Sequence, residues 1–239
     1  MLATLETVLN PECDKELRRL LEKHDGEFED EALLFGNTLY SKNYREYYRK
    51  YPSVGFGPGF AGWGLAGNGP YQSFGNGSAM RVAPIGEAFA DVNDVILHAI
   101  ASAACTHNHP EGIKGAVVTA VCIWMGRYGY SKDEILGYVK KHYENQDMIK
   151  KYSMEEVRTC NQGVYAVACQ FTVPAAVVCF VESTSFEECI ENALSFNGDS
   201  DTIASVAGAI AGAHYGSLSD TVRNIVFEKL PEELRSKFF

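Results

Sequence analysis

The sequence predicts an all-α fold, built as a single compact multi-helix domain over residues 1–239. Helix-start signals recur along the chain, whereas no clean alternation of apolar and polar residues predicts strands and no tandem repeat is present. The segment IKGAVVTAVCIWMGRYG, which begins at Ile113, is apolar almost all round and is typical of a buried central helix. Apolar residues make up 46% of the chain, as expected for a globular protein with a real core.

The first helices are predicted from local start signals. The dipeptide Asn10–Pro11 places a cap and a proline at a helix start, and this helix can run to about His24. A second helical pattern begins near Asp30, and a third covers residues 43–51. Residues 52–78 are rich in glycine and are predicted to form one long loop, which in a compact domain is often functional.

Further helices follow the glycine-rich loop. Asp91 caps an expected helix that runs to about Cys105, and Ile113–Tyr128 forms the central helix. Three later helices each follow the capping-box pattern of a serine and a glutamate, at Ser131–Glu134, Ser153–Glu156 and Ser185–Glu188. The segment TVPAAVVCFVES, from Thr172, has β-branched residues that would suit a strand. Its early proline and its flanking helices favour a helix instead.

Composition argues against several classes of function. The formal net charge of −10 disfavours nucleic acid as a partner, and an acidic surface either concentrates cations or simply keeps a protein soluble. No apolar run reaches the roughly eighteen residues of a membrane span, and the first residues do not resemble a signal peptide. The seven cysteines include no CxxC pair, which predicts reduced thiols in a cytoplasmic protein.

The segment NGDSDTIASVAGAIAGAHYG, Asn197–Gly216, predicts a central helix that begins with an acidic cluster. Small residues that let a neighbouring helix approach closely recur every four positions, at Ala204, Gly208, Gly212 and Gly216. Asp199 fits the N-cap, and Asp201 and Thr202 fall in the first turn. One interpretation is that the carboxylates interact with the helix dipole, which stabilises a helix by about 0.3–1 kcal/mol.

A second interpretation of this acidic cluster is a metal site. One aspartate is enough to cap a helix, whereas two carboxylates and a hydroxyl at a buried helix end repel each other and lose hydration. A hard divalent cation bound by the oxygens of Asp199, Asp201 and Thr202 would compensate for that cost. The Asp-x-Asp-Thr spacing alone does not decide between the two interpretations.

The segment SFGNGSAMRVAPIG, Ser73–Gly86, predicts an anion-binding loop. Gly75 and Gly77 allow the backbone to approach a ligand closely, and Ser78 can cap the helix expected to follow. Free N–H groups there would suit a phosphate or diphosphate, and Arg81 could pair with that anion. The alternative is a glycine turn with a capping serine and a structural arginine.

The segment THNHPEG contains two histidines, His107 and His109. Because they are two positions apart, they point in different directions in any regular structure. A histidine at a helix end is usually a cap or a hydrogen bonder of the core. We therefore do not expect the two rings to hold one metal ion.

Together, in this order and spacing, FGNGSAMRVAPIG, THNHPEGIKGA and NGDSDTIASVAGAIAGAHYG resemble three signatures of the ADP-ribosylglycohydrolase family. This family includes dinitrogenase-reductase-activating glycohydrolase and the ADP-ribosyl-acceptor hydrolases. The match is clearest over residues 30–239, and residues 1–29 are atypical. The resemblance implies an all-α protein that uses two magnesium ions to hydrolyse the bond between ADP-ribose and an acceptor such as arginine or serine.

The resemblance also assigns roles to individual residues. The metal ligands would be Asp199, Asp201 and Thr202, with Asp199 and Asp201 the catalytic residues. The loop residues that resemble those holding the distal ribose and diphosphate are Gly75, Asn76, Gly77, Ser78 and Met80, and His107 matches a histidine near the ligand. The expected partner is ADP-ribose or an ADP-ribosylated protein, with no nucleic acid and no membrane.

The chain departs from the family pattern in its first part. The family has a Gly-Asp segment near its start and a Thr-Asp-Asp triplet that supply the other half of the metal site, but this chain contains no Asp-Asp pair. Glu29, Asp30 and Glu31 lie about where the triplet belongs; they are either substitute ligands or a solvated helix start. We therefore expect one Mg²⁺ rather than two, with Mn²⁺ as an alternative. The hydrolase hypothesis stands beside two others, a non-catalytic ADP-ribose binder and a purely structural scaffold.

Overall fold

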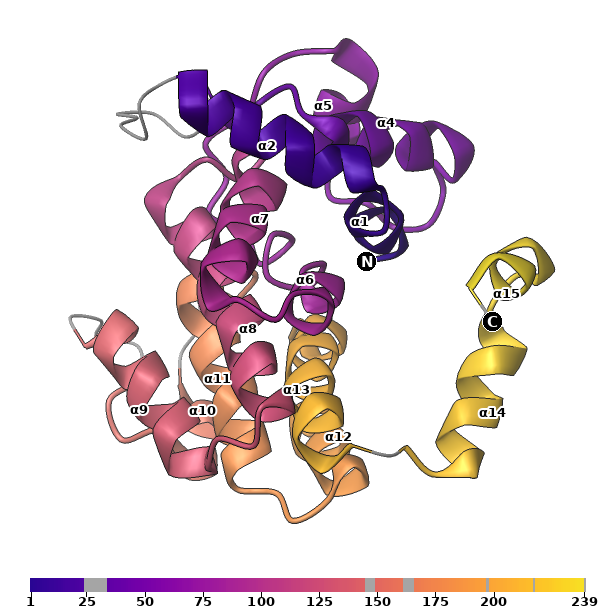
Figure 1. Cartoon of the computed structure of the whole chain (residues 1–239). Helices are drawn as coiled ribbons and strands as arrows, with labels where there is room; N and C mark the ends of the chain where they lie inside the picture. The colour runs from indigo at the N-terminus through magenta and orange to yellow at the C-terminus, as the bar shows by residue number, and fades with distance from the viewer. Residues whose placement is uncertain (24–33, 145–148, 161–165, 197, 217, 239) are drawn as a thin grey trace.

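The computed structural model describes residues 1–23, 34–144, 149–160, 166–196, 198–216 and 218–238 (Figure 1). This part of the chain contains fourteen helices and no strand, which confirms the all-α prediction. The helices are α1 (Leu2–Val8), α2 (Pro11–Lys23), α4 (Leu39–Lys50), α5 (Pro58–Ala66), α6 (Ala83–Ala88), α7 (Val92–Ala104), α8 (Pro110–Arg127), α9 (Lys132–Tyr143), α10 (Met154–Thr159), α11 (Cys169–Val181), α12 (Phe186–Leu194), α13 (Ser200–Tyr215), α14 (Asp220–Lys229) and α15 (Glu232–Phe238).

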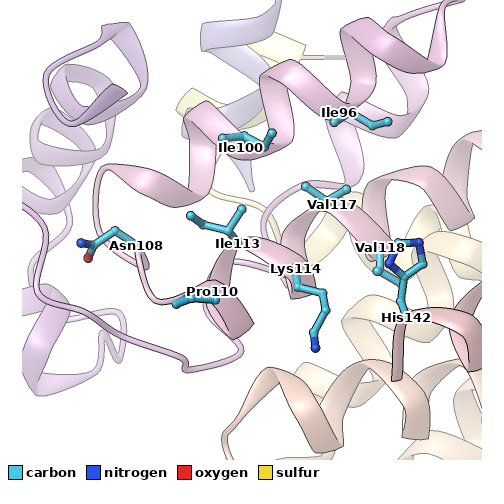
Figure 2. Close-up of a pocket in the computed structure, with 9 residues that line it drawn as sticks. All are labelled: Ile96, Ile100, Asn108, Pro110, Ile113, Lys114, Val117, Val118 and His142. Atoms are coloured by element: carbon cyan, nitrogen blue, oxygen red, sulfur yellow. The ribbon is translucent and has the colours of Figure 1, made fainter. Parts of the chain in front are cut away.

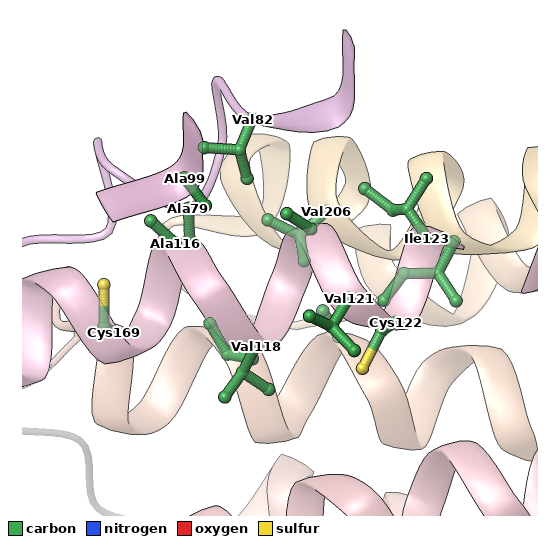
Figure 3. Close-up of a cluster of buried hydrophobic side chains, with 14 of the residues drawn as sticks. Ala79, Val82, Ala99, Ala116, Val118, Val121, Cys122, Ile123, Cys169 and Val206 are labelled. Atoms are coloured by element: carbon green, nitrogen blue, oxygen red, sulfur yellow. The ribbon is translucent and has the colours of Figure 1, made fainter. Parts of the chain in front are cut away.

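Helix α8 is the centre of the core, as its apolar sequence predicts. It packs against α6, α7, α9, α11 and α13. Figure 3 shows Ala116, Val118 and Ile123 of α8 together with Val82 and Val206 from neighbouring segments. An apolar surface on every side requires partners on every side, and the surrounding helices supply them.

Helices α11 and α13 complete the core and confirm two further predictions. The TVPAAVVCFVES segment lies in a helix, and Pro174 within it is buried. Helix α13 follows its N-cap Asp199, and Ile203, Val206 and Ile210 are buried. At Gly208, an added Cβ would lie 2.8 Å from Cδ1 of Ile190, so the small-residue ridge lets α12 approach closely.

Two predicted boundaries in the first third of the chain are wrong. Residues 52–78 do not form one loop, because α5 lies within them. Its start is favoured by Pro58 in the first turn, and Phe60 packs against Trp63 and against the α4 residue Tyr48. Aromatic packing thus stabilises a helix that its glycine content disfavours. Helix α4 also begins at Leu39, earlier than the predicted residue 43.

Ser78 does not cap a helix, contrary to the sequence-based expectation. Residues 76–81 form turns, and α6 begins only at Ala83 with Val82 at its N-cap. By contrast, Ser131, Ser153 and Ser185 each accept a hydrogen bond from the glutamate N–H three residues later, as predicted. The predicted residues His24, Glu29, Asp30 and Glu31 lie outside the described part of the chain.

The two ends of the chain differ in how they join the core. Helix α2 meets α7 where Asp14 Oδ1 lies 3.5 Å from Nε2 of the buried His98, whose Nδ1 lies 2.9 Å from the Tyr40 hydroxyl. Helix α14 stands apart from the core in Figure 1 and has no buried residue. The last helix, α15, contacts α4 through an ion pair between Glu233 and Lys50.

Two further observations concern the whole described chain. None of its helices is long and apolar enough to cross a membrane. All seven cysteines are free thiols, and six of them are buried. The prediction of reduced thiols agrees with this geometry.

Candidate functional site

The glycine loop, here residues 73–81, is held against the start of α11 by backbone hydrogen bonds. Gly75 forms an isolated antiparallel bridge with Ala168, and the Asn76 N–H donates to the Val167 carbonyl over 2.8 Å. This pairing places a loop from the first half of the chain beside a helix from the second half. Gly75 and Gly77 are half-buried, and His107 Nε2 lies beside both of them.

Asn76 joins the glycine loop to the acidic start of α13. Its buried side-chain Nδ2 donates to Asp199 Oδ2 over 2.5 Å and to Thr172 Oγ1 over 2.9 Å. Asn76 and Asp199 are 123 positions apart in the sequence. The structure therefore brings together two of the three segments that the sequence singles out.

The Asp199 side chain bonds to neighbouring side chains and not to the backbone N–H groups of its own helix. Asp199 occupies the N-cap position but makes no side-chain cap hydrogen bond, and its Oδ1 accepts from Thr202 Oγ1 over 3.1 Å. Partial burial raises the pKa of Asp199, and the neighbouring Asp201 carboxylate raises it further, while hydrogen bonds from Asn76 and Thr202 oppose the rise. The helix-cap interpretation does not account for this arrangement.

The oxygens of Asp199, Asp201 and Thr202 suit a hard divalent ion. Two neighbouring carboxylates concentrate negative charge, and the Asp201 carboxylate adds to the rise in the pKa of Asp199 that burial causes. Within the described ranges, no group of three or more His, Cys, Asp or Glu side chains could hold a metal. Mg²⁺ accepts a site with one or two carboxylates because it keeps several of its waters. The described residues fit one such ion.

Ser78 and Arg81 are turned into the protein. Ser78 is fully buried and its hydroxyl donates to the Gly112 carbonyl over 2.7 Å. The Arg81 guanidinium donates to the Ser102 carbonyl over 2.6 Å and stacks 4.3 Å from the ring centroid of Tyr44. Arg81 is only 5% exposed, so the structure favours the alternative of a structural arginine over an anion-pairing one. The Ser78 side chain likewise fixes the loop.

The two histidines of THNHPEG have separate roles, as their spacing predicts. His109 is the N-cap of α8, and its Nδ1 accepts from the Glu111 N–H over 3.1 Å. His107 is buried beside the glycine loop, and an added Cβ at Gly77 would lie 3.1 Å from its Nε2. Burial, reinforced by the Arg81 charge, holds the pKa of His107 well below its usual value. His107 is therefore a neutral group that faces the loop.

Met80 lies between the loop and α13. Its side chain is 41% exposed, and its sulfur lies 3.9 Å from Thr202 Oγ1. The loop residues Asn76 and Met80 thus both reach the first turn of α13. Two of the residues predicted for ligand binding therefore contact the residues predicted for metal binding, whereas Ser78 faces the core.

Two threonines of the site were not identified from the sequence. Thr172 shares the Asn76 amide with Asp199, and Thr106 bonds to both Arg81 and His107. Thr106 directly precedes the candidate His107 in the sequence, and this position could have predicted that Thr106 belongs to the site. Thr172 lies in an apolar segment, where nothing in the spacing indicates a polar role.

A separate cavity of about 310 Å³ opens between α7, α8 and α9 (Figure 2). Its walls are mainly apolar side chains with two basic ones, and the lining residues are Ile96, Ile100, Asn108, Pro110, Ile113, Lys114, Val117, Val118 and His142. None of the residues predicted for metal or ligand binding lines it. The candidate site therefore rests on the contacts between the loop, His107 and α13.

The described chain is an all-α protein in which a glycine loop is bonded through Asn76 to the aspartate-bearing start of α13. The family model for ADP-ribosylglycohydrolase matches residues 1–236. The chain belongs to the ADP-ribosylglycohydrolase family.

Individual relatives agree with this assignment. The chain is 31% identical over 187 residues to the human ADP-ribosylhydrolase ARH3, a match that covers 60% of this chain and 51% of that protein. It is 32% identical over 177 residues to an uncharacterized protein of Archaeoglobus fulgidus, with 68% and 57% covered. An ADP-ribosylarginine hydrolase, Tri1 of Pseudomonas putida, is 27% identical over 162 residues, with 65% and 42% covered.

A solved structure supports the fold. A chain of an ADP-ribosylglycohydrolase-related protein complex superimposes with a TM-score of 0.59 at 22% identity, covering 93% of this chain and 76% of that chain. At this identity the likeness shows the fold alone. The chain spans about half the length of the curated ARH3 relatives that it matches.

Proposed function

We propose that this protein hydrolyses the glycosidic bond between ADP-ribose and an acceptor, in a reaction that depends on a divalent metal ion. The observation that carries the proposal is the bond from Asn76 to Asp199, which joins the expected ADP-ribose loop to the expected metal ligands. Relatives named as an ADP-ribosylhydrolase and an ADP-ribosylarginine hydrolase support the reaction class. The free thiols support a cytoplasmic location as part of this proposal.

In this proposal the loop backbone binds the ligand, and neighbouring side chains orient the Asp199 carboxylate. Within Gly75–Gly77, the Gly75 N–H donates to Ser73 Oγ and the Asn76 N–H to the Val167 carbonyl, so the Gly77 N–H is the group that would donate to a diphosphate. Asn76 fixes the Asp199 carboxylate from one side and Thr202 fixes it from the other. These bonds hold the carboxylate in one orientation before any ligand arrives, which reduces the reorganisation needed on binding.

One bound Mg²⁺, or Mn²⁺ in its place, would be held by Asp199, Asp201 and Thr202 with water in the remaining positions. When bound, the ion supplies charge that orients a ribose hydroxyl and lowers the pKa of an attacking water. The chain's own contribution is to gather three oxygens at one helix start and to place the ligand loop beside them.

A second candidate function is ADP-ribose binding without turnover. It is favoured by one observation: the described residues bring only two carboxylates to the site, whereas metal-dependent members of the family use more. Glu29, Asp30 and Glu31 could supply the remainder, and they lie outside the described ranges. The two functions share the loop and differ in whether the bond is cleaved.

Calorimetry with ADP-ribose, with and without Mg²⁺, tests the shared part of the two functions. We expect binding in both conditions and tighter binding with the ion. Absence of binding in both conditions would contradict both functions, and the hypothesis of a purely structural scaffold would remain. Release of ADP-ribose from ADP-ribosyl-arginine and ADP-ribosyl-serine peptides then separates the hydrolase from the binder.

The variant Asp201→Asn tests the metal role. Asparagine preserves shape but removes the charge, so hydrolysis is expected to fall by orders of magnitude, because each ~1.4 kcal/mol of lost stabilisation is tenfold in rate. Metal-free thermal stability is expected to hold or rise, because carboxylate repulsion is relieved. Asp133→Asn, in the exposed first turn of α9, is the matched control and should change neither measurement beyond a small dipole effect. Hydrolysis by Asp201→Asn at the wild-type rate would show that Asp201 only interacts with the helix dipole.

A further inference from the structure

We propose that Arg81 and Thr106 hold His107 in the neutral form that carries its proton on Nε2, so that His107 donates a hydrogen bond to an acceptor oxygen of the bound ligand. Arg81 and Thr106 act as positioning residues in this arrangement. The identity of the ligand, ADP-ribose, rests on the proposed function. The state of the imidazole ring follows from the hydrogen-bond geometry of the chain.

The hydroxyl proton of Thr106 has only one good hydrogen-bond acceptor. The Arg81 guanidinium can only donate, and its Nη2 lies 2.8 Å from Thr106 Oγ1, so the hydroxyl accepts there. The hydroxyl proton must then point to a different acceptor. Nδ1 of His107 lies 2.7 Å away, and the Ala103 carbonyl lies 3.5 Å away.

The Ala103 carbonyl is already satisfied. It accepts the Thr106 N–H over 3.0 Å and the His107 N–H over 2.7 Å, which uses both of its lone pairs. A third bond at 3.5 Å would be at the limit of hydrogen bonding. The Thr106 hydroxyl therefore donates to Nδ1, and Nδ1 of His107 must be without a proton.

The surroundings also disfavour the doubly protonated ring. His107 is 5% exposed, and Arg81 lies on the same side of it through Thr106. The other titratable group packed against the ring is Tyr71, whose ring centroid lies 5.8 Å away. A second positive charge beside the guanidinium would find no carboxylate among these neighbours. The ring is neutral, with its one proton on Nε2.

Nε2 faces the glycine loop. An added Cβ would lie 3.1 Å from Nε2 at Gly77 and 3.7 Å from it at Gly75. Within the described part of the chain, the structure gives Nε2 no hydrogen-bond partner. A ligand on this loop thus meets a fixed N–H donor from His107 beside the backbone of Gly75–Gly77. A hydroxyl or diphosphate oxygen can accept from it, and Nε2 cannot serve as a general base.

Histidine-selective ¹⁵N NMR on the full chain tests the ring directly, without a ligand. The signal of His107 is assigned by its loss in H107Q. We expect wild-type His107 to show a protonated Nε2 and an unprotonated Nδ1, unchanged from about pH 8 to about pH 6 because the ring stays neutral. A protonated Nδ1, or a mixture of the two tautomers, would overturn the proposal. T106V should release the ring into such a mixture, and T106S should restore the wild-type signature.

ADP-ribose affinity tests the use of the donor. The amide nitrogen of glutamine occupies the place of Nε2, and that of asparagine the place of Nδ1, so H107N should lose about tenfold or more and H107Q should lose less. T106V should weaken binding and T106S should recover most of it. Equal losses in H107Q and H107N, or wild-type affinity in T106V, would overturn the donor role. If wild-type protein binds no ADP-ribose, the proposed function and the donor role fail together, and the NMR result still decides the ring state.

Discussion

Helices α8 and α14 both carry several large apolar residues, yet they stand in opposite environments. Helix α8 is surrounded by neighbouring helices, whereas α14 has no buried residue and exposes Ile225, Val226 and Phe227. The difference shows that apolar content alone does not place a helix in the core. A helix becomes buried when its apolar side chains continue around the whole surface and small residues admit neighbours. Substitutions should therefore have very different effects in the two places.

The largest effect is expected for Gly115→Val in α8. An added Cβ at Gly115 would lie 2.6 Å from Cβ of Cys169 on α11, and the valine methyl groups would extend further. Because two helix backbones must separate to relieve this overlap, we expect a loss of about 3 kcal/mol in the free energy of unfolding. Urea unfolding followed by circular dichroism measures it. A loss below about 1 kcal/mol would mean that α8 and α11 are packed less closely than described.

The next effect is acid destabilisation through buried histidines of the core. Burial lowers the pKa of His98, with partial opposition from Asp14, and burial and the Arg81 charge lower the pKa of His107. The unfolded chain therefore takes up protons at a higher pH than the native one. Stability is retained above about pH 6.5 and is lost as the pH falls below it, by at most about 1.4 kcal/mol per pH unit for each histidine.

Free energies of unfolding at about pH 7.5 and about pH 5.5 provide the measurement. His98→Gln should flatten the slope, because glutamine does not titrate. A pH profile that is flat in wild-type protein would contradict the lowered pKa values. An unchanged slope in His98→Gln would assign the effect to another group.

Gly137→Ala in α9 should have a smaller effect of opposite sign. The glycine lies inside a helix, and an added Cβ would meet no atom within 4 Å. Alanine restricts the unfolded chain, so the free energy of unfolding should rise by about 0.4–1 kcal/mol. Together with Gly115→Val, this variant separates glycines kept for close packing from glycines that packing does not require. Thermal and urea unfolding would show the gain, and a loss would reveal a contact absent from the structure.

The smallest effect is expected on α14. Ile225 is 53% exposed, so Ile225→Gln removes little buried apolar surface and should change the free energy of unfolding by less than about 0.5 kcal/mol. The same urea assay measures it, at two protein concentrations. A cost above about 1 kcal/mol, or one that depends on concentration, would show that α14 is covered in solution.

Elements with a strong local signal were predictable from the sequence. Helix α8 follows from its apolar composition, and α9, α10 and α12 follow from serines that cap them. Helix α5 was missed because its glycines oppose a helix locally, and its aromatic contacts with Tyr48 are invisible in the sequence of the segment itself. Local rules fail where a tertiary contact reverses a local preference.

The candidate site was predictable as separate pieces. Residue types and spacing singled out the glycine loop, the histidine and the two aspartates, and the family resemblance implied that they belong together. The contact between Asn76 and Asp199 spans 123 positions, so no periodicity could reveal it. The inward turn of Arg81 was equally hidden, because its partners Ser102 and Thr106 come from a different helix end.

Because six of the seven cysteines are buried, their reaction with thiol reagents reports when the helices around them separate. Burial raises the pKa of Cys105 and Cys169 to about 11, and thiol reagents attack the thiolate form. In the closed state these thiols are therefore both shielded and protonated. Only Cys160 is partly accessible, so its alkylation reports the surface, and alkylation of Cys122 in α8 reports separation of the central helices. Mass spectrometry of a timed labelling reaction would then rank the helices by how often each one leaves the core, with no engineered probe.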